Sequence, residues 1–230
     1  MEQRRVAVVI VAGGSGRRMG GALPKQFSIV GGEPVLVRTI NAFAQALPGA
    51  KIVVVLPASQ KDYWRNLAAR FTVARHSVVD GGAERFHSVR AGVESLTEGY
   101  DLIAVQDGVR PLVSRELILR TVECAAQYGA AVPVVLPVDS FREVEAEGGS
   151  HIVDRSQLRV VQTPQIFAAD ILRAAYDVEY SAEFTDDASV VERAGFRVAL
   201  TEGERQNIKI TTPEDLYIAE ALLDARRDME

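Results

Sequence analysis

The sequence predicts an α/β protein with a mostly parallel, twisted sheet and helices on both of its faces. One observation is a set of short, continuous apolar runs at residues 6–12, 52–56, 102–105 and 131–136. Such runs are typical of strands that are buried on both faces of a parallel sheet. The other is that amphipathic stretches separate these runs, which gives the alternating order of a doubly wound sheet. In that architecture, ligands bind at the carboxyl ends of the strands.

Helix boundaries follow from local signals in the sequence. Apolar residues between 36 and 47 share one helical face, and the Pro-Gly pair at 48–49 is expected to end that helix. A second helix is predicted to run to about Tyr128. Ser114 is its expected N-cap and Gly129 its expected stop.

One segment, at about 138–160, interrupts the alternation and predicts a β-hairpin arm. Its residues alternate around the sequence EGGS at 147–150, which is typical of a hairpin turn. The segment has few large apolar residues, so we expect it to project from the core. An exposed two-stranded arm is marginally stable alone, and a partner subunit is the expected contact. The chain, 1–230, is thus predicted to be a single domain whose arm serves dimerisation.

Composition and charge limit the class of protein. The chain has 230 residues, of which 47% are hydrophobic and 25% charged, the profile of an ordinary globular protein. A net charge of −5 argues against a polyanion-binding surface, so phosphate groups should meet a local cluster of Lys and Arg. A single cysteine, Cys124, excludes an internal disulfide and a Cys-based zinc site. No apolar window is long enough to span a membrane, and a cytoplasmic location is expected.

The stretch VAGGSGRRMGGALPKQF, residues 11–27, places glycines and cations directly after the first apolar run. Glycines there let backbone N–H groups approach phosphate oxygens. The stretch lacks the Gly-Lys pair of a Walker A loop, and it does not match the G-x-G-x-x-G dinucleotide fingerprint. Its glycines and its cations, Arg17, Arg18 and Lys25, suit a triphosphate whose charge is neutralised during reaction. A structural turn with a solvated basic patch is the alternative.

Polar residues follow two other predicted strands. Asp107 comes at a strand's carboxyl end, where its carboxylate could hold Mg²⁺ against a phosphate, and Arg110 could bind a second phosphate. The alternative is a tight turn in which Asp107 is only a turn former. The Gly-Gly pair at 81–82 opens a helix that carries Ser88, and these groups could contact a pyrimidine base. A plain helix N-terminus is the alternative there.

The chain resembles the cytidylyltransferases that act on sugar-alcohol phosphates. The resemblance is carried by motifs that occur in order over nearly the whole chain: AGGSGRRMG (12–20), PKQF (24–27), GGAERFHSV (81–89), QDGVRP (106–111), VDR (153–155), VQTPQIF (161–167), FTDDAS (184–189) and NIKITTPEDL (207–216). It implies a Rossmann-like nucleotidyltransferase fold and transfer of CMP from CTP to a sugar-alcohol phosphate. It also implies Mg²⁺ or another divalent cation, and a homodimer.

The resemblance assigns the nucleotide site to positions near the strand ends: Val11, Ala12, Gly13, Gly14, Gly16, Gly81, Gly82, Ala83, Ser88 and Gly108. The family usually has Asp where Ala83 stands, so only main-chain contacts are expected at that position. Cations with implied catalytic roles are Arg18, Lys25, Arg155 and Lys209.

The resemblance also implies an acceptor site. Its residues would be Asp107, which would also hold the metal, and Arg110, Ser140, Arg155, Thr163, Thr185 and Lys209. Ser140 replaces the usual Thr of the family, which keeps the hydroxyl and loses a methyl group. Because Ser140 and Arg155 lie in the arm, they are expected to reach into the neighbouring subunit.

Local structure is also predicted around these motifs. The segments 163–165 and 185–187 are expected to lead from loops into helices, with Thr185 or Asp186 as a cap for the latter. A short strand is expected at 207–210 and would carry Lys209. The last helix is expected to open with Thr212 as N-cap and a proline in its first turn.

Three alternatives stand beside this interpretation. A ribitol 5-phosphate cytidylyltransferase shares the glycine loop and the PKQF, VRP and TPQ elements, whereas VDR, FTDDAS and NIKITTPEDL favour methylerythritol phosphate as acceptor. A nicotinamide-dependent oxidoreductase is disfavoured by the failed fingerprint. A nucleotide-binding regulatory protein without turnover is disfavoured because candidates for every charged role are present.

Overall fold

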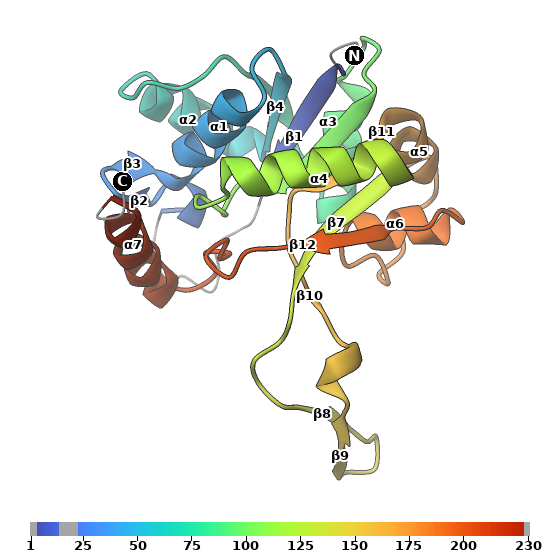
Figure 1. The fold of residues 1–230 in the computed structure, drawn as a ribbon. Helices are drawn as coiled ribbons and strands as arrows, with labels where there is room; N and C mark the ends of the chain where they lie inside the picture. Colours follow the sequence, from blue (N-terminus) through green and yellow to red (C-terminus); the bar gives the residue numbers. More distant parts are fainter. Residues whose placement is uncertain (1–3, 14–22, 228–230) are drawn as a thin grey trace.

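The computed structural model describes residues 4–13 and 23–227. Its centre is an eight-stranded sheet. The strands are β1 (Val6–Val11), β4 (Lys51–Leu56), β5 (Ser77–Asp80), β6 (Leu102–Asp107), β7 (Ala130–Val135), β10 (Val160–Val161), β11 (Gln165–Ala168) and β12 (Ala199–Glu202). Their order across the sheet is β10-β7-β11-β6-β1-β4-β5, with β12 on β7 (Figure 1).

The middle of the sheet is parallel. Strand β1 pairs in parallel with β4 on one side and β6 on the other, and β5 extends this parallel half. Strand β11 is antiparallel to β6 and β7, which makes the sheet mixed. The apolar runs that form β1, β4 and β6 are almost completely buried, as expected for central parallel strands. The predicted mostly parallel α/β fold is confirmed.

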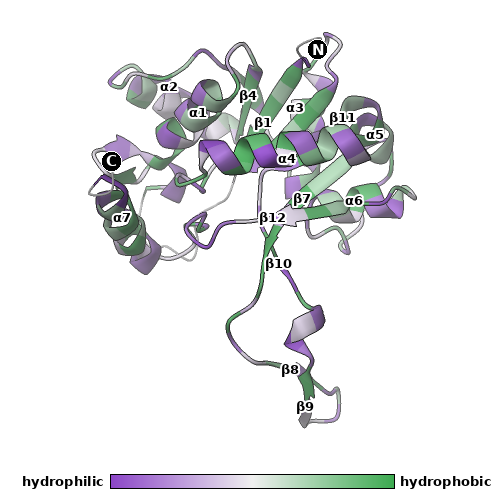
Figure 2. Ribbon diagram, viewed as in Figure 1, coloured by the Kyte–Doolittle hydropathy of each residue, from purple (hydrophilic) through white to green (hydrophobic). Residues whose placement is uncertain are grey.

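Helices cover both faces of the sheet. On one face lie α1 (Val35–Ala46), α2 (Lys61–Ala68) and α4 (Arg115–Tyr128), which pack in the larger hydrophobic cluster. On the other lie α3 (Arg85–Glu94), α5 (Ala169–Ala175) and α6 (Asp187–Arg193). Figure 2 shows apolar strands between helices whose surfaces are mixed, which is the pattern of two cores separated by one sheet.

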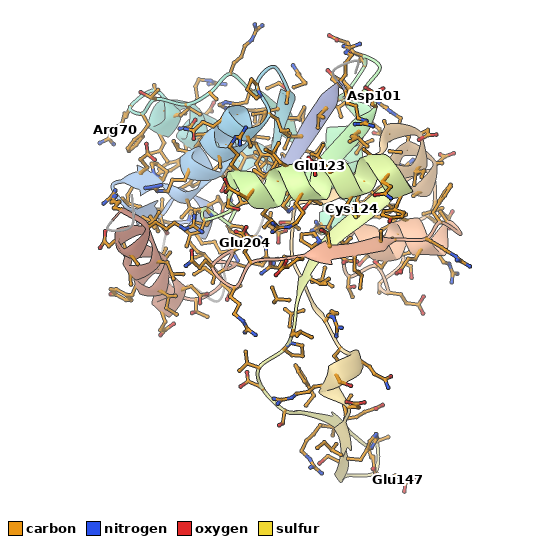
Figure 3. The ribbon with its side chains drawn as sticks, viewed as in Figure 1. Arg70, Asp101, Glu123, Cys124, Glu147 and Glu204 are labelled. Atoms are coloured by element: carbon orange, nitrogen blue, oxygen red, sulfur yellow. The ribbon has the colours of Figure 1, made fainter. Side chains whose placement is uncertain are left out.

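The predicted helix ends are confirmed. The Ser114 hydroxyl accepts a hydrogen bond from the Leu117 N–H at 3.0 Å, so it caps α4. Gly129 ends this helix with φ at 85°, a left-handed conformation that glycine adopts without strain. Cys124 lies on the same helix, half-buried against the core (Figure 3).

The last helix, α7 (Pro213–Arg227), covers a small third cluster beside the short strands β2 (Ile29–Val30) and β3 (Glu33–Pro34). It begins at the predicted proline. Its first turn is fixed by the Asp215 carboxylate, which accepts the backbone N–H groups of Thr211 and Thr212 at 2.6 and 2.8 Å.

The arm is a hairpin of β8 (Phe141–Val144) and β9 (Ser150–Val153), followed by the short helix η4 (Arg155–Gln157). Figure 1 shows it extending away from the sheet, and Glu147 marks its tip in Figure 3. The predicted Gly-Gly turn is present, with φ at 87° for Gly148 and 114° for Gly149. Apolar side chains on the arm are exposed, including Phe141, Val144 and Ile152.

Two local predictions were wrong. The segment after Thr163 leads into strand β11 and not into a helix, because Gln165 pairs with β6 at the middle of the sheet. Residues 207–210 form no strand: Ile210 donates its N–H to the carbonyl of Val109, and the carbonyl of Asn207 accepts from Arg110. Single contacts to the loop after β6 replace the ladder of a strand there.

Within the described ranges 4–13 and 23–227, no helix is long and apolar enough to cross a membrane.

Candidate active site

The loops that follow β1, β5 and β6 meet at one edge of the sheet. The N–H of Ala12 donates to the carbonyl of Val55 at 2.9 Å, and the N–H of Gly108 donates to the carbonyl of Val11 at 2.8 Å. The N–H of Gly81 donates to the carbonyl of Leu56 at 2.8 Å. The structure therefore brings together three of the segments predicted to bind a nucleotide. Four further predicted residues, Gly14, Gly16, Arg17 and Arg18, lie outside the described residues.

Ser88 packs under the loop at 81–82. Its buried hydroxyl accepts from the N–H of Gly82 at 3.2 Å and donates to the carbonyl of Glu84 at 3.2 Å. A Cβ atom at Gly81 would come within 2.9 Å of this hydroxyl, so the close approach requires glycine. Ser88 thus shapes the loop, while Gly82 and Ala83 are exposed at the site.

The PKQF motif forms a short helix, η2 (Lys25–Phe27), that is fixed to the end of β1. The completely buried amide of Gln26 donates to the carbonyl of Ala12 at 2.8 Å and to Gln60 Oε1 at 2.7 Å. Phe27 stacks on Trp64 with a ring distance of 6.1 Å. These contacts hold the half-buried Lys25 near the carboxyl end of β1.

Asp107 is the centre of a charged cluster at this edge. Its carboxylate pairs with Lys209 Nζ at 3.0 Å, Arg110 Nε at 3.3 Å and Arg85 Nε at 3.7 Å. Burial alone would raise the pKa of Asp107, but the charges of Arg85, Lys209 and Arg110 outweigh it and hold that pKa well below its usual range. Asp107 is therefore an ionised carboxylate at neutral pH.

Arg110 and Thr163 are fixed to the same cluster by hydrogen bonds. Arg110 Nη1 donates to the carbonyl of Asn207 at 2.7 Å, and Asn207 Nδ2 donates to the carbonyl of Thr163 at 2.8 Å. The Thr163 hydroxyl accepts the N–H of Asp107 at 3.1 Å. Burial lowers the pKa of Arg110 despite the opposing charge of Asp107, but a guanidinium remains cationic in proteins.

Sequence reasoning missed a second ion pair beside the cluster. Arg85 donates to both carboxylate oxygens of the fully buried Asp187, at 2.9 and 2.6 Å, and Tyr176 Oη donates to Asp187 Oδ1 at 2.6 Å. Both charged residues lie inside quoted motifs, GGAERFHSV and FTDDAS. Nothing local indicates that they pair, because 102 residues separate them in sequence.

Thr185 lies two residues before Asp187 of this ion pair. Asp186 caps α6 by accepting the N–H of Ser189 at 2.9 Å, which confirms the predicted helix entry. Gln165 on β11 donates to Asp186 Oδ2 at 2.8 Å and accepts the N–H of Ala188 at 2.8 Å. The exposed Thr185 is thereby held near the sheet edge that carries Asp107.

Two predicted acceptor residues are not at this edge within one chain. Ser140 and Arg155 are exposed on the arm, where the Arg155 guanidinium donates to the carbonyl of Val138. Figure 1 shows that the arm points away from the sheet.

A resident metal would have few protein ligands here. No group of three or more His, Cys, Asp or Glu side chains that could hold a metal occurs in the described part of the chain. Asp107 nevertheless fits Mg²⁺, because Mg²⁺ in nucleotide sites is often held by one or two carboxylates together with substrate phosphates. The ionised state of Asp107 agrees with that role.

The segments at 12–13 and 81–82, a half-buried lysine and a carboxylate surrounded by cations, all at the carboxyl ends of parallel strands, define an α/β protein of the nucleotidyltransferase type. The model of the family "2-C-methyl-D-erythritol 4-phosphate cytidylyltransferase" matches residues 6–225. The chain belongs to this family.

Individual relatives agree with this assignment. A 2-C-methyl-D-erythritol 4-phosphate cytidylyltransferase of Phocaeicola vulgatus is 50% identical over 94% of this chain and 98% of its own length. The solved structure of the cytidylyltransferase from Thermus thermophilus is 36% identical, with a TM-score of 0.74 over 95% of this chain and 98% of that one. The 4-diphosphocytidyl-2C-methyl-D-erythritol synthase of Anaerococcus prevotii is 26% identical, with a TM-score of 0.82 over 96% of both chains.

Proposed function

We propose that this chain transfers the cytidylyl group of CTP to 2-C-methyl-D-erythritol 4-phosphate and releases pyrophosphate, a step of the non-mevalonate isoprenoid pathway. The observation that carries this proposal is the cluster of Asp107 with Lys209, Arg110 and Arg85 beside the carboxyl end of β1. Its position at the carboxyl ends of β1 and β6 is where an α/β sheet binds ligands. Family membership supplies the substrates, since the family and its relatives carry the cytidylyltransferase name.

The reaction is an in-line displacement at the α-phosphorus of CTP. A phosphate oxygen of the acceptor forms the new P–O bond, the bond from the α-phosphorus to the bridging oxygen breaks, and pyrophosphate leaves with that electron pair. The acceptor oxygen is already anionic near neutral pH, so no general base is needed. Catalysis therefore consists of positioning and charge stabilisation.

The charge of the site suits this chemistry. Three cations surround Asp107, and one of them, Arg85, is also neutralised by Asp187, so the cluster keeps a net positive charge. Lys209 and Arg110 are the proposed ligands of the acceptor phosphate. Lys25, together with Arg18, is proposed to offset charge on the α-phosphoryl group and the leaving pyrophosphate.

The proposed divalent cation is Mg²⁺, held by Asp107 and by phosphate oxygens of CTP. Bound there, it would neutralise triphosphate charge as a Lewis acid. Asp107 would hold this cation, and Lys209 and Arg110 beside it would supply positive charge for the phosphate groups.

We propose that the protein acts as a homodimer in which the arm completes the neighbour's acceptor site with Ser140 and Arg155. Exposed apolar side chains on the arm support a contact with a second copy. A hollow of about 690 Å³ at the base of the arm, lined in part by Leu136, Leu200 and Arg205, offers room for such a contact. A cytoplasmic location remains a prediction.

Ribitol 5-phosphate as acceptor and a nicotinamide-dependent reaction are not favoured, since the matching family and relatives are named for methylerythritol phosphate. Pyrophosphate release with CTP and Mg²⁺ tests the choice of acceptor. We expect strong turnover with 2-C-methyl-D-erythritol 4-phosphate and little with D-ribitol 5-phosphate. Turnover with ribitol 5-phosphate alone would contradict the proposed acceptor but not the chemistry. Absence of release with either would contradict the proposed activity.

A further inference from the structure

Arg85 connects the two halves of the proposed site. It is the first residue of α3, directly after the loop at 81–84 that is proposed to contact the nucleotide. Its guanidinium reaches Asp187 at the start of α6, two residues after Thr185, which is proposed to contact the acceptor. Between these elements, Arg85 Nε lies 3.7 Å from Asp107 Oδ1.

The cations around Asp107 divide its two carboxylate oxygens. Lys209 Nζ and Arg110 Nε both pair with Oδ2, at 3.0 and 3.3 Å, whereas Arg85 pairs with Oδ1. Lys209 and Arg110 share Oδ2, so phosphate groups that bind these two cations would leave the pair of Oδ1 with Arg85 in place. Arg85 therefore contacts the carboxylate differently from the two cations that are proposed to bind phosphate.

The orientation of the Arg85 guanidinium is fixed by Asp187. Both of its Nη atoms are occupied by Asp187, in the bidentate geometry that gives arginine its directional specificity. Asp187 is itself completely buried and accepts a further hydrogen bond from Tyr176. The pair uses one N–H of each Nη atom and so fixes the plane of the guanidinium, whose Nε lies 3.7 Å from Asp107 Oδ1.

We propose that Arg85 is a positioning residue: held by Asp187 and Tyr176, it fixes the Asp107 carboxylate while Lys209 and Arg110 bind phosphate groups. This inference rests on the proposed function, since Asp107 acts there on metal and substrate. Loss of Arg85 should disturb the alignment of reacting groups more than the binding of CTP. Misplacement of about 1 Å in an active site can cost on the order of 100-fold in rate.

The test separates the effect of Arg85 on the alignment of reacting groups from its effect on folding stability. Arg85→Gln leaves the buried Asp187 without its cation and should lower Tm. The double variant Arg85→Gln/Asp187→Asn removes both charges, so Tm should return toward the wild-type value. We expect kcat for pyrophosphate release to stay about 10–100-fold low in the double variant, with the KM for CTP changed by less than about 3-fold.

Arg85→Lys and Arg90→Gln complete the set. Arg85→Lys keeps the charge but loses the bidentate fork, so we expect reduced kcat, and this variant decides the matter if the double variant does not fold. Arg90 lies on the same helix in an exposed pair with Glu94 at 3.0 Å, and Arg90→Gln should match the wild type. The inference would be overturned if the double variant is stable and has wild-type kcat. If the double variant does not fold, wild-type kcat in Arg85→Lys would overturn it. No turnover in the wild type and in Arg90→Gln would overturn the proposed function and, with it, this role of Arg85.

Discussion

Among single residues, Asp107 pairs with three cations of the site. An unpaired carboxyl group as buried as this one would tend to take up a proton. Lys209, Arg110 and Arg85 prevent this, and each of them also has a proposed role in binding or positioning. The same three cations therefore keep Asp107 ionised, as a metal ligand must be, and give the cluster the positive charge that phosphates require. Their pairing with Asp107 also contributes to folding stability.

The lowered pKa of Asp107 predicts a pH dependence of stability. Because the pKa in the folded state lies below the unfolded value of about 4, the ionised carboxylate stabilises the fold fully above about pH 5. This stabilisation is lost as pH falls below about 4 toward the folded-state pKa. Asp107→Asn should cost about 3 kcal/mol near neutral pH. The difference from wild type should shrink in acid, as measured by urea unfolding across the pH range.

Asp62→Asn is the matched control for that experiment. Asp62 pairs with Arg65 at 2.7 Å on the surface of α2, with 86% of its side chain exposed. Exposed ion pairs contribute little to folding stability. The unfolding free energy of Asp62→Asn should therefore stay within about 1 kcal/mol of the wild-type value at every pH. A pH-independent difference between Asp107→Asn and wild type would show that Asp107 is not the titrating group.

At the scale of elements, helix α3 determines how the two proposed half-sites meet, because it carries both Arg85 and Ser88. Its distance from the sheet depends on Gly92, which faces β1 and β4. A Cβ atom at Gly92 would lie 2.4 Å from Val9 Cγ1 and 3.0 Å from Val55 Cγ2. The helix approaches the strands closely only because this position has no side chain.

Gly92→Ala should therefore destabilise the protein. Alanine favours the helix by up to about 1 kcal/mol, but overpacking against buried strands typically costs about 1–3 kcal/mol. We expect a net loss of unfolding free energy, and a lower kcat as α3 shifts Arg85. Gly99→Ala is the control, since a Cβ atom there meets nothing within 4 Å. Equal stability of the two variants would contradict the close packing of α3.

Features that depend on local sequence could be predicted, whereas features that depend on tertiary contacts could not. The cap of α4 by Ser114 and its stop at Gly129 follow from local chemistry, and the buried strands follow from continuous apolar runs. The pairing of Arg85 with Asp187 depends on tertiary contact between α3 and α6, which no local pattern encodes. The strand predicted for Lys209 is absent for the same reason: its apolar neighbours pack on the loop after β6 and not in the sheet.

For the whole molecule, the arm leaves the proposed acceptor site incomplete within one chain. The cluster around Asp107 lies at the sheet edge, whereas Ser140 and Arg155 lie on the exposed arm (Figure 1). A closed two-fold dimer would exchange the arms equally, so each site would combine one core with the other chain's arm. Two kinds of inactive variant would then complement each other.

Mixing Arg155→Ala with Lys209→Ala tests this arrangement. Each variant alone should turn over poorly, because every site lacks one phosphate ligand. In a heterodimer, the core with Lys209 receives the arm with Arg155, so one site is intact. Random pairing of equal amounts should restore about a quarter of wild-type turnover. Co-expression of Lys209→Ala with Asp107→Ala, both in the core, should restore none. If the arm instead served its own chain, the first mixture would also remain inactive while sedimentation still showed a dimer.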